Sequence, residues 1–188
     1  MKTSIFIIFS FLPIFIFGQF EAAIYGSMSY SNSSAIQSNS YGIQLEVNHI
    51  PNDYFAIGLF GGFTKYNNDY NDKNHLFSTG ILVEGRAQFT EKMKIIPIIN
   101  GSIGYCTEYT NYTYMYGENN EKTGIVDRHQ NGIYLSLRLG LISNFEKLAP
   151  FNFKIDIGLV KTVIEPFKVF SVGSQQYLQS RLGVVYNF

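Results

Sequence analysis

The feature that most constrains this chain is a hydrophobic alternation of period two, which recurs in segments of about ten residues. In the last segment the apolar residues share one face of an extended strand and the polar residues share the other, because successive side chains point to opposite sides. The apolar face there is made of Leu178, Leu182, Val184, Tyr186 and Phe188, opposite Gln179, Arg181, Gly183 and Asn187. Val185 is the one apolar residue on the polar side. The alternation predicts strands with one apolar and one polar face, and therefore an all-β chain.

Eight segments carry this pattern, and each is predicted to form a strand. They cover residues 22–31, 40–50, 54–66, 76–89, 94–107, 130–144, 151–163 and 178–188. The fifth segment is irregular, because Ile96 and Ile98 fall on its polar face. Pro97 lies on its apolar face, which indicates a strand end or a bulge near a rim.

The connections between these segments are predicted to alternate in length. Short turns are expected at 51–53, 90–93 and 145–150, and longer polar loops at 32–39, 67–75, 108–129 and 164–176. Short turns on one rim and long loops on the other are typical of up-and-down barrels that cross a membrane. An even number of strands would place both ends of the barrel on the rim with the short turns.

Alternation alone does not decide whether the apolar face points outward to lipid or inward to a pocket, as in a soluble lipocalin-like barrel. Three features favour lipid. Charged residues make up only 15% of the chain, and it has no Trp and a single cysteine. Aromatic residues gather near the predicted strand ends, as expected for membrane interfaces: Tyr30, Tyr41, Phe55, Phe63, Phe77, Phe89, Tyr105, Phe151 and Phe153. The predicted fold is an eight-stranded antiparallel up-and-down transmembrane β-barrel, closed because an open edge in hydrocarbon would leave peptide groups unpaired.

The amino terminus has the features of a secretory signal peptide. Lys2 precedes an apolar run from Ile5 to Phe17, and Gly18 offers a small residue for cleavage. We therefore expect a signal peptide at 1–18 and an outer-membrane barrel domain at 19–188. The 14 basic and 14 acidic residues balance, so nothing in the charge indicates a nucleic-acid partner. Cys106 is expected to be a small side chain facing the lumen, with a reactive thiol as the alternative.

Charged residues on the polar faces are expected to meet at one depth inside the barrel. They are Glu46, Glu84 and Asp156 with Arg86, Arg138, Lys154 and Arg181. We interpret them as an ion-pair network that plugs the lumen of a barrel of this size. The alternative interpretation is a gated pore or a proton path.

No catalytic, metal or cofactor site is predicted. His49 is expected near a turn, and His75 and His129 are expected in two different extracellular loops. The chain has neither a His-Glu-X-X-His nor a Gly-X-Ser-X-Gly motif. Within the predicted loop 108–129, a candidate contact surface for a glycan, peptide or partner protein consists of Tyr109, Tyr112, Tyr114 and Tyr116. These tyrosines can also be read as interface aromatics followed by a solvated loop.

The leader, the alternating faces and the terminal stretch Leu182–Phe188 together resemble the small outer-membrane β-barrel families of Gram-negative bacteria, namely the OmpA-type transmembrane domain and the OmpX-like proteins. The resemblance implies a place in the cell outer membrane, in contact with its lipid. It also implies that Leu182, Val184, Tyr186 and Phe188 form the signal read by the barrel assembly machinery. Since the chain stops at the barrel, a periplasmic peptidoglycan-binding domain is not expected.

The expected function is a non-enzymatic barrel with a structural role or a loop-mediated adhesion or binding role at the cell surface. A small-solute porin, or an accessory barrel of a secretion or transport assembly, is the alternative. An enzyme and a soluble lipocalin-like carrier rank below both.

Overall fold

The computed structural model describes residues 19–33, 36–67, 73–90, 92–115, 122–145, 148–164 and 173–188. The predicted signal peptide, residues 1–18, lies outside this part of the chain. Among the described residues, no helix is long and apolar enough to cross a membrane.

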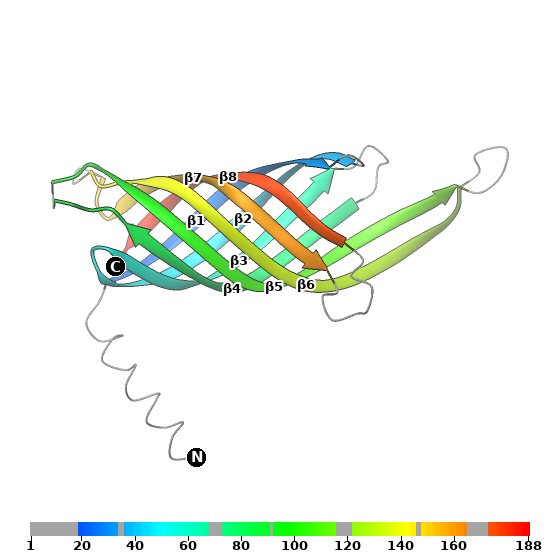
Figure 1. The fold of residues 1–188 in the computed structure, drawn as a ribbon, viewed down its shortest axis with the longest axis horizontal. Helices are drawn as coiled ribbons and strands as arrows, with labels where there is room; N and C mark the ends of the chain where they lie inside the picture. The colour runs from blue at the N-terminus through cyan, green and yellow to red at the C-terminus, as the bar shows by residue number, and fades with distance from the viewer. Residues whose placement is uncertain are drawn as a thin grey trace, which may run out of the picture.

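Eight antiparallel strands close into a barrel in which each strand pairs with its neighbours in the chain (Figure 1). They are β1 (Gln19–Ser33), β2 (Ile36–Asn52), β3 (Phe55–Asn67), β4 (Lys73–Arg86), β5 (Ile95–Met115), β6 (Lys122–Ser143), β7 (Phe151–Ile164) and β8 (Gly173–Asn187). The seam between β1 and β8 runs from Glu21 paired with Asn187 to Tyr30 paired with Leu178. Phe188 also donates its backbone N–H to the Phe20 carbonyl oxygen, at 2.9 Å. The barrel therefore has no open edge across its wall, and the predicted fold is confirmed.

The predicted alternation of loop lengths is wrong, because the strands run further than the hydrophobic pattern suggests. β1 and β2 pair as far as Ser33 and Ile36, inside the predicted loop 32–39. β5 and β6 pair from Tyr109 and His129 outward, inside the predicted loop 108–129. Outside a membrane both faces of a hairpin are wet, so the backbone ladder continues while the alternation that marks it in sequence fades. In the opposite sense, residues 87–89 were expected in the fourth strand, but β4 ends at Arg86.

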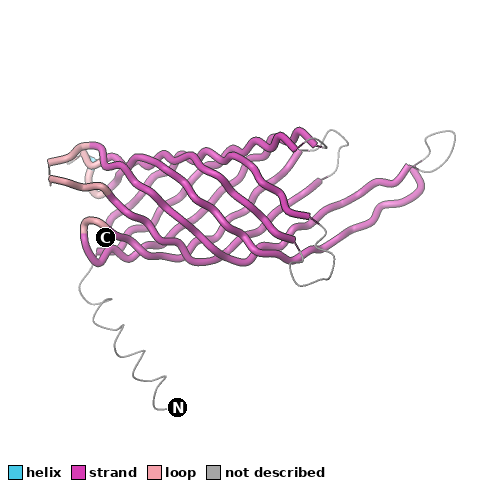
Figure 2. Tube along the Cα trace, viewed as in Figure 1, coloured by secondary structure: helices cyan, strands magenta, loops and turns pink. Residues whose placement is uncertain are grey.

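The longest extension is the hairpin formed by β5 and β6. In Figures 1 and 2 it projects well beyond the other strands at the end of the barrel opposite the carboxyl terminus. Its register is continuous from Ile95 paired with Ser143 to Tyr114 paired with Gly124, and shifts between Tyr114 and Met115. Pro97 lies near the start of β5, at the rim that carries the carboxyl terminus, as the sequence indicates.

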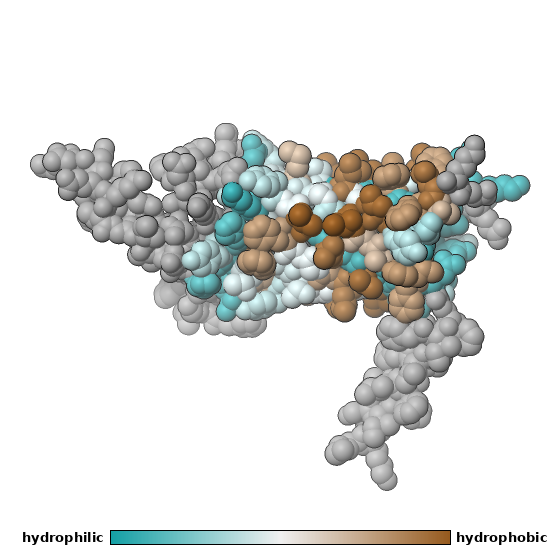
Figure 3. Space-filling model, turned by 180° about the vertical axis from the view of Figure 1, so that it is seen from behind, coloured by the Kyte–Doolittle hydropathy of each residue, from teal (hydrophilic) through white to brown (hydrophobic). Residues whose placement is uncertain are grey.

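The barrel exposes its apolar side chains and buries its polar ones, which is the reverse of a soluble protein. Leu137 is 59% exposed and its neighbour along the strand, Arg138, is 1% exposed. Figure 3 shows hydrophobic residues over the barrel wall on one side of the molecule, with hydrophilic residues toward both ends. All nine aromatic residues expected near strand ends are exposed. An exterior of this kind is suited to lipid and not to water, so the interpretation as a transmembrane barrel holds and the lipocalin-like alternative is rejected.

Candidate functional site

The lumen is filled by side chains in three layers. Along β6 the inward positions run from Tyr134 through Arg138 to Ile142, and along β8 from Tyr177 through Arg181 to Val185. The outer layer is a buried apolar and aromatic cluster of Phe60, Tyr66, Leu76, Leu82, Cys106, Tyr134, Val160 and Tyr177. The layer nearest the carboxyl terminus is a second cluster of Ala23, Tyr25, Ile96, Ile98, Ile142 and Val185. Arg138 and Arg181 lie between these two apolar layers along their strands. Ile96, Ile98 and Val185, which break the alternation in sequence, belong to the second layer.

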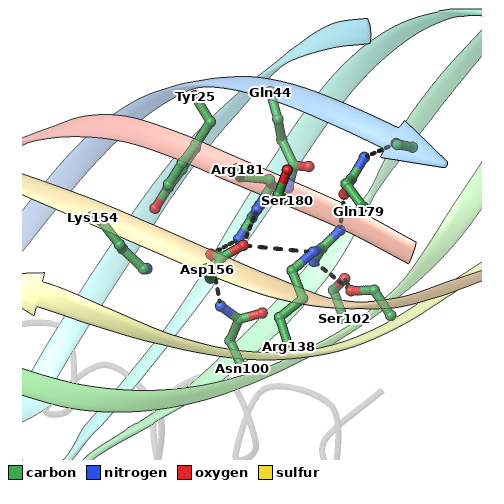
Figure 4. A network of polar contacts seen from close by, with 12 residues as sticks. Tyr25, Gln44, Asn100, Ser102, Arg138, Lys154, Asp156, Gln179, Ser180 and Arg181 are labelled. Carbon is green, nitrogen blue, oxygen red and sulfur yellow. Dashed lines mark hydrogen bonds and ion pairs between the residues drawn. The ribbon is translucent and has the colours of Figure 1, made fainter. Parts of the chain in front are cut away.

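Arg181 on β8 joins two carboxylates that come from different strands. Its Nη1 lies 2.5 Å from Oε1 of Glu46 on β2, and its Nη2 lies 2.6 Å from Oδ2 of Asp156 on β7. A second bond, from Nε of Arg181 to Oδ1 of Asp156 at 2.8 Å, makes the latter contact bidentate. Bidentate guanidinium–carboxylate pairs are strong and directional. Arg181 thus links β2 and β7 to β8 from inside the barrel, and Figure 4 shows its contact with Asp156.

Lys154 extends the charged layer toward β4. Its Nζ donates a short hydrogen bond to Oε2 of Glu84 and lies 3.7 Å from Oε2 of Glu46. Arg86 then binds Oε1 of Glu84 at 2.9 Å and Oε1 of Glu21 at 2.7 Å. A continuous chain of opposite charges therefore crosses the lumen from β7 to β1.

Arg138 on β6 connects the charged layer to the outer apolar layer. Its Nη2 donates to the Tyr134 hydroxyl at 2.5 Å and to Oε1 of Gln179 at 2.7 Å, and its Nη1 donates to the Ser136 hydroxyl at 2.5 Å. Its Nε lies 3.9 Å from Oδ1 of Asp156, a longer ion pair. Since a buried charge is costly unless it is paired and hydrogen-bonded, this set of partners is what allows Arg138 to lie in the lumen.

All seven lumen residues named from the sequence take part in this ion-pair network, which reaches the rim at Arg86, and the structure adds two more. Glu21 is fully buried and binds both Arg86 and the Nδ2 of Asn48. Tyr25 lies under Arg181 and donates its hydroxyl to Glu46 at 3.0 Å. With Glu21 included, the described network balances four acids, Glu21, Glu46, Glu84 and Asp156, against four bases, Arg86, Arg138, Lys154 and Arg181. Extending the first strand by one residue would have placed Glu21 on the polar face of its sequence pattern.

Glycines on the inner wall provide room for the large side chains. A Cβ at Gly158 would lie 2.8 Å from Cγ of Arg138, and a Cβ at Gly183 would clash with the Tyr25 ring. Close approach of this kind is one reason for glycine within a strand. The large side chains of the lumen therefore fit only because the neighbouring strands carry glycine at these positions.

The remaining candidate residues are distributed over the barrel. Cys106 is buried in the outer apolar layer, as a small lumen-facing side chain. Tyr109, Tyr112 and Tyr114 lie on β5, and Tyr116 lies outside the described residues. The terminal residues Leu182, Val184, Tyr186 and Phe188 are exposed on the outer face. Rings of the last two pack together, with centroids 4.9 Å apart.

His49 lies near a turn as the sequence predicts, whereas His75 and His129 do not lie where they were expected. His49 is in β2 and packs against the Phe20 ring at 5.0 Å. The placement of His75 and His129 in separate loops is wrong, because they lie on β4 and β6 and each pairs with Tyr109 of β5. In the part of the chain that the structure describes, no group of three or more His, Cys, Asp or Glu residues is arranged to hold a metal ion.

A closed eight-stranded barrel with an apolar exterior and an ion-paired interior is the architecture of small transmembrane β-barrels. Solved structures of outer-membrane proteins superpose on this barrel. Neisserial surface protein A superposes with a TM-score of 0.61 at 17% identity, covering 90% of this chain and 97% of that one. Ail, the attachment invasion locus protein of Yersinia pestis, crystallised with the heparin analogue sucrose octasulfate, gives 0.54 at 15% identity, covering 91% and 99%.

The same fold also occurs in a protein that is an enzyme. The outer membrane enzyme PagL superposes with a TM-score of 0.52 at 10% identity, covering 87% of this chain and 98% of that one. No protein-family model and no curated protein matches the sequence. At these identities the comparisons establish the fold that the sequence resemblance implies, and the function has to be argued from the chain itself.

Proposed function

We propose that this protein is a non-enzymatic β-barrel of the bacterial outer membrane, with a plugged lumen, that acts at the cell surface as a structural element or by binding through its extracellular hairpin. The observation that carries the proposal is the charged layer itself. Arg138, Lys154 and Arg181 are each about 1% exposed and span the lumen with their carboxylate partners. An interior of this kind leaves the outer surface and the hairpin as the parts free to act.

The binding part of the proposal rests on the hairpin formed by β5 and β6. It extends the barrel by paired strands, and β5 carries Tyr109, Tyr112 and Tyr114. In the sequence, Tyr116 is the residue after the end of β5. Tyrosine offers a large contact area at a low cost in side-chain entropy, which suits a contact with a partner protein or glycan. The similarity to Ail, whose name refers to attachment, is consistent with such a role.

The alternative is a small-solute porin or an accessory barrel of a transport assembly. One observation favours it. A polar recess of about 210 Å³ is lined by Arg86, Asp53, Asn144 and Asn152 among others, at the rim that carries the carboxyl terminus. Such a recess would be the entrance of a channel if the charged layer beyond it opened.

Conductance distinguishes the two functions. The full chain is expressed in a Gram-negative host, recovered from the outer-membrane fraction and inserted into planar bilayers. A shift in electrophoretic mobility between unheated and boiled samples verifies the folded barrel. We expect no discrete current steps from the wild type. The double variant Asp156→Ser/Arg181→Ser removes one acid and one base, so the lumen keeps its charge balance but holds smaller side chains, and this variant should conduct. Reproducible steps from the wild type at the size seen with the variant would favour the porin.

The hairpin is tested separately, by adhesion of cells that express the protein to host-cell or matrix surfaces. Replacing Tyr109, Tyr112, Tyr114 and Tyr116 together by Ser should abolish adhesion while the mobility shift is retained. Equal adhesion by this variant and the wild type would remove the hairpin from the proposal and leave the structural role.

A further inference from the structure

Five residues on the outer face form a continuous row across five neighbouring strands. Tyr41 of β2 pairs with Lys65 of β3, and Lys65 pairs with His75 of β4. His75 pairs with Tyr109 of β5, and Tyr109 pairs with His129 of β6. Adjacent strands in a sheet lie about 4.8 Å apart, so directly paired residues on one face are immediate neighbours. Three basic side chains and two tyrosines thus share one row, which we call the basic row.

Each basic residue of the row is held against an aromatic ring. The Lys65 Nζ lies 5.9 Å from the centroid of the Tyr41 ring. The His129 ring lies 4.5 Å from that of Tyr109, in an edge-on arrangement. The His75 ring stacks on Phe63, with centroids 5.3 Å apart. These contacts restrict the three basic side chains before any ligand arrives, which lowers the entropic cost of binding.

The basic row begins at the edge of the apolar belt. Ile43, Phe63 and Phe77 lie next to it on the same face, toward mid-membrane, and all three are exposed. Strands of a closed barrel tilt by roughly 35–45°, so a row that follows their pairing runs obliquely, from the belt toward the protruding hairpin. The row therefore crosses the level at which lipid headgroups meet the barrel.

The described side chains around the row carry no negative charge. On the outward face of β2 to β6, the side chains that the structure describes include no acid, because Glu46, Glu84 and Glu108 are buried. An acidic residue, Asp127, precedes His129 by two positions in β6, on the side away from the belt. The row therefore brings together one ammonium group and two imidazole rings, all of which can donate hydrogen bonds to an anion.

We propose that the basic row binds the phosphate groups of lipid headgroups in the outer leaflet, as presented by a phosphorylated glycolipid such as lipid A. The ammonium group of Lys65 and the imidazole N–H groups of His75 and His129 donate to phosphate oxygens, and Tyr41 and Tyr109 lie at the interface between acyl chains and headgroups. The site orients and anchors the barrel below its hairpin. It is independent of whether the lumen conducts, since it lies entirely on the outer wall.

The test is a titration of the detergent-folded full chain with bis-phosphorylated lipid A, compared with the same lipid after enzymatic removal of its phosphates. The variant Lys65→Gln/His75→Gln/His129→Gln should bind the phosphorylated lipid at least about tenfold more weakly, as expected when charge-assisted hydrogen bonds are lost. The matched control is Lys161→Gln. Lys161 is also exposed on the outer wall, but it pairs with Leu135 and Gln176 and not with an aromatic residue. This control should bind within about twofold of the wild type.

Each of three outcomes would overturn the proposal. Removing the lipid phosphates could leave the affinity unchanged, which would mean that the wall binds acyl chains only. The triple variant could bind as the wild type does, while its mobility shift on heating shows a folded barrel. Finally, millimolar inorganic phosphate could displace the lipid completely, which would assign the row to a free anion. Retention of lipid binding in inorganic phosphate, together with its loss in the triple variant, supports the lipid site.

Discussion

The guanidinium carbon of Arg181 lies 4.4 Å from the centroid of the Tyr25 ring, so a buried cation rests on an aromatic face inside the barrel. The Tyr25 hydroxyl donates to Glu46, which Arg181 also binds. Tyr25 therefore supports the pair in two ways, through its ring and through its hydroxyl. A cation over an aromatic ring contributes about 2 kcal/mol or more when it is desolvated.

These two contributions can be separated by substitution at position 25. Tyr25→Phe keeps the ring and removes one hydrogen bond to a carboxylate, so it should lower the free energy of unfolding by about 1–3 kcal/mol. Tyr25→Leu removes the ring as well and should cost more than Tyr25→Phe. Urea titration in phospholipid vesicles gives both values. Equal costs for the two variants would show that the ring does not stabilise Arg181.

Arg181 is expected to be the most sensitive member of the network. Arg181→Met removes the bidentate partner of the buried Asp156 and leaves it only the 3.9 Å ion pair with Arg138, so it should cost roughly 3–5 kcal/mol, the usual effect of removing one partner of a buried ion pair. Arg181→Met combined with Asp156→Leu removes both charges and should cost less than Arg181→Met alone. The same urea titrations test this, and a double variant less stable than the single one would show that the two residues are not coupled as a pair.

Glu21 is expected to stabilise the barrel, although the sequence pattern did not place it among the lumen residues. Glu21→Gln removes the carboxylate that binds Arg86 at 2.7 Å and leaves the lumen one positive charge in excess. We expect a loss of about 1–3 kcal/mol in unfolding free energy. Asp53→Asn is the matched control, because Asp53 is an exposed acid in the turn between β2 and β3, and it should change stability by less than about 0.5 kcal/mol. Similar values for the two variants would contradict a role of Glu21 in the network.

The alternation predicts the fold because in a membrane the two faces of every strand meet opposite environments. Where both faces are wet, as in the outer part of the β5–β6 hairpin, the sequence carries no such contrast, and the strand ends were misplaced. The same argument predicts the charged lumen residues, apart from Glu21 at the very start of β1. The alignment of Lys65, His75 and His129 could not be predicted from the sequence, because it depends on the register between strands. Alternation specifies which face a residue takes but not which residue lies opposite it on the next strand.

The outer wall provides the most direct test of membrane insertion. Leu137 is 59% exposed, and it lies on β6 between Leu135 and Leu139, which are also exposed. Arginine on the lipid face costs about 2–4 kcal/mol at the bilayer midplane and about 0–1 kcal/mol near the interface. Leu137→Arg should therefore destabilise the folded barrel in vesicles by roughly 2–4 kcal/mol. The control is Leu178→Arg. Because Leu178 is paired with Tyr30, one of the aromatic residues near the strand ends, this substitution should cost about 1 kcal/mol or less. If both variants folded with the free energy of the wild type, the surface that carries Leu137 would not face lipid.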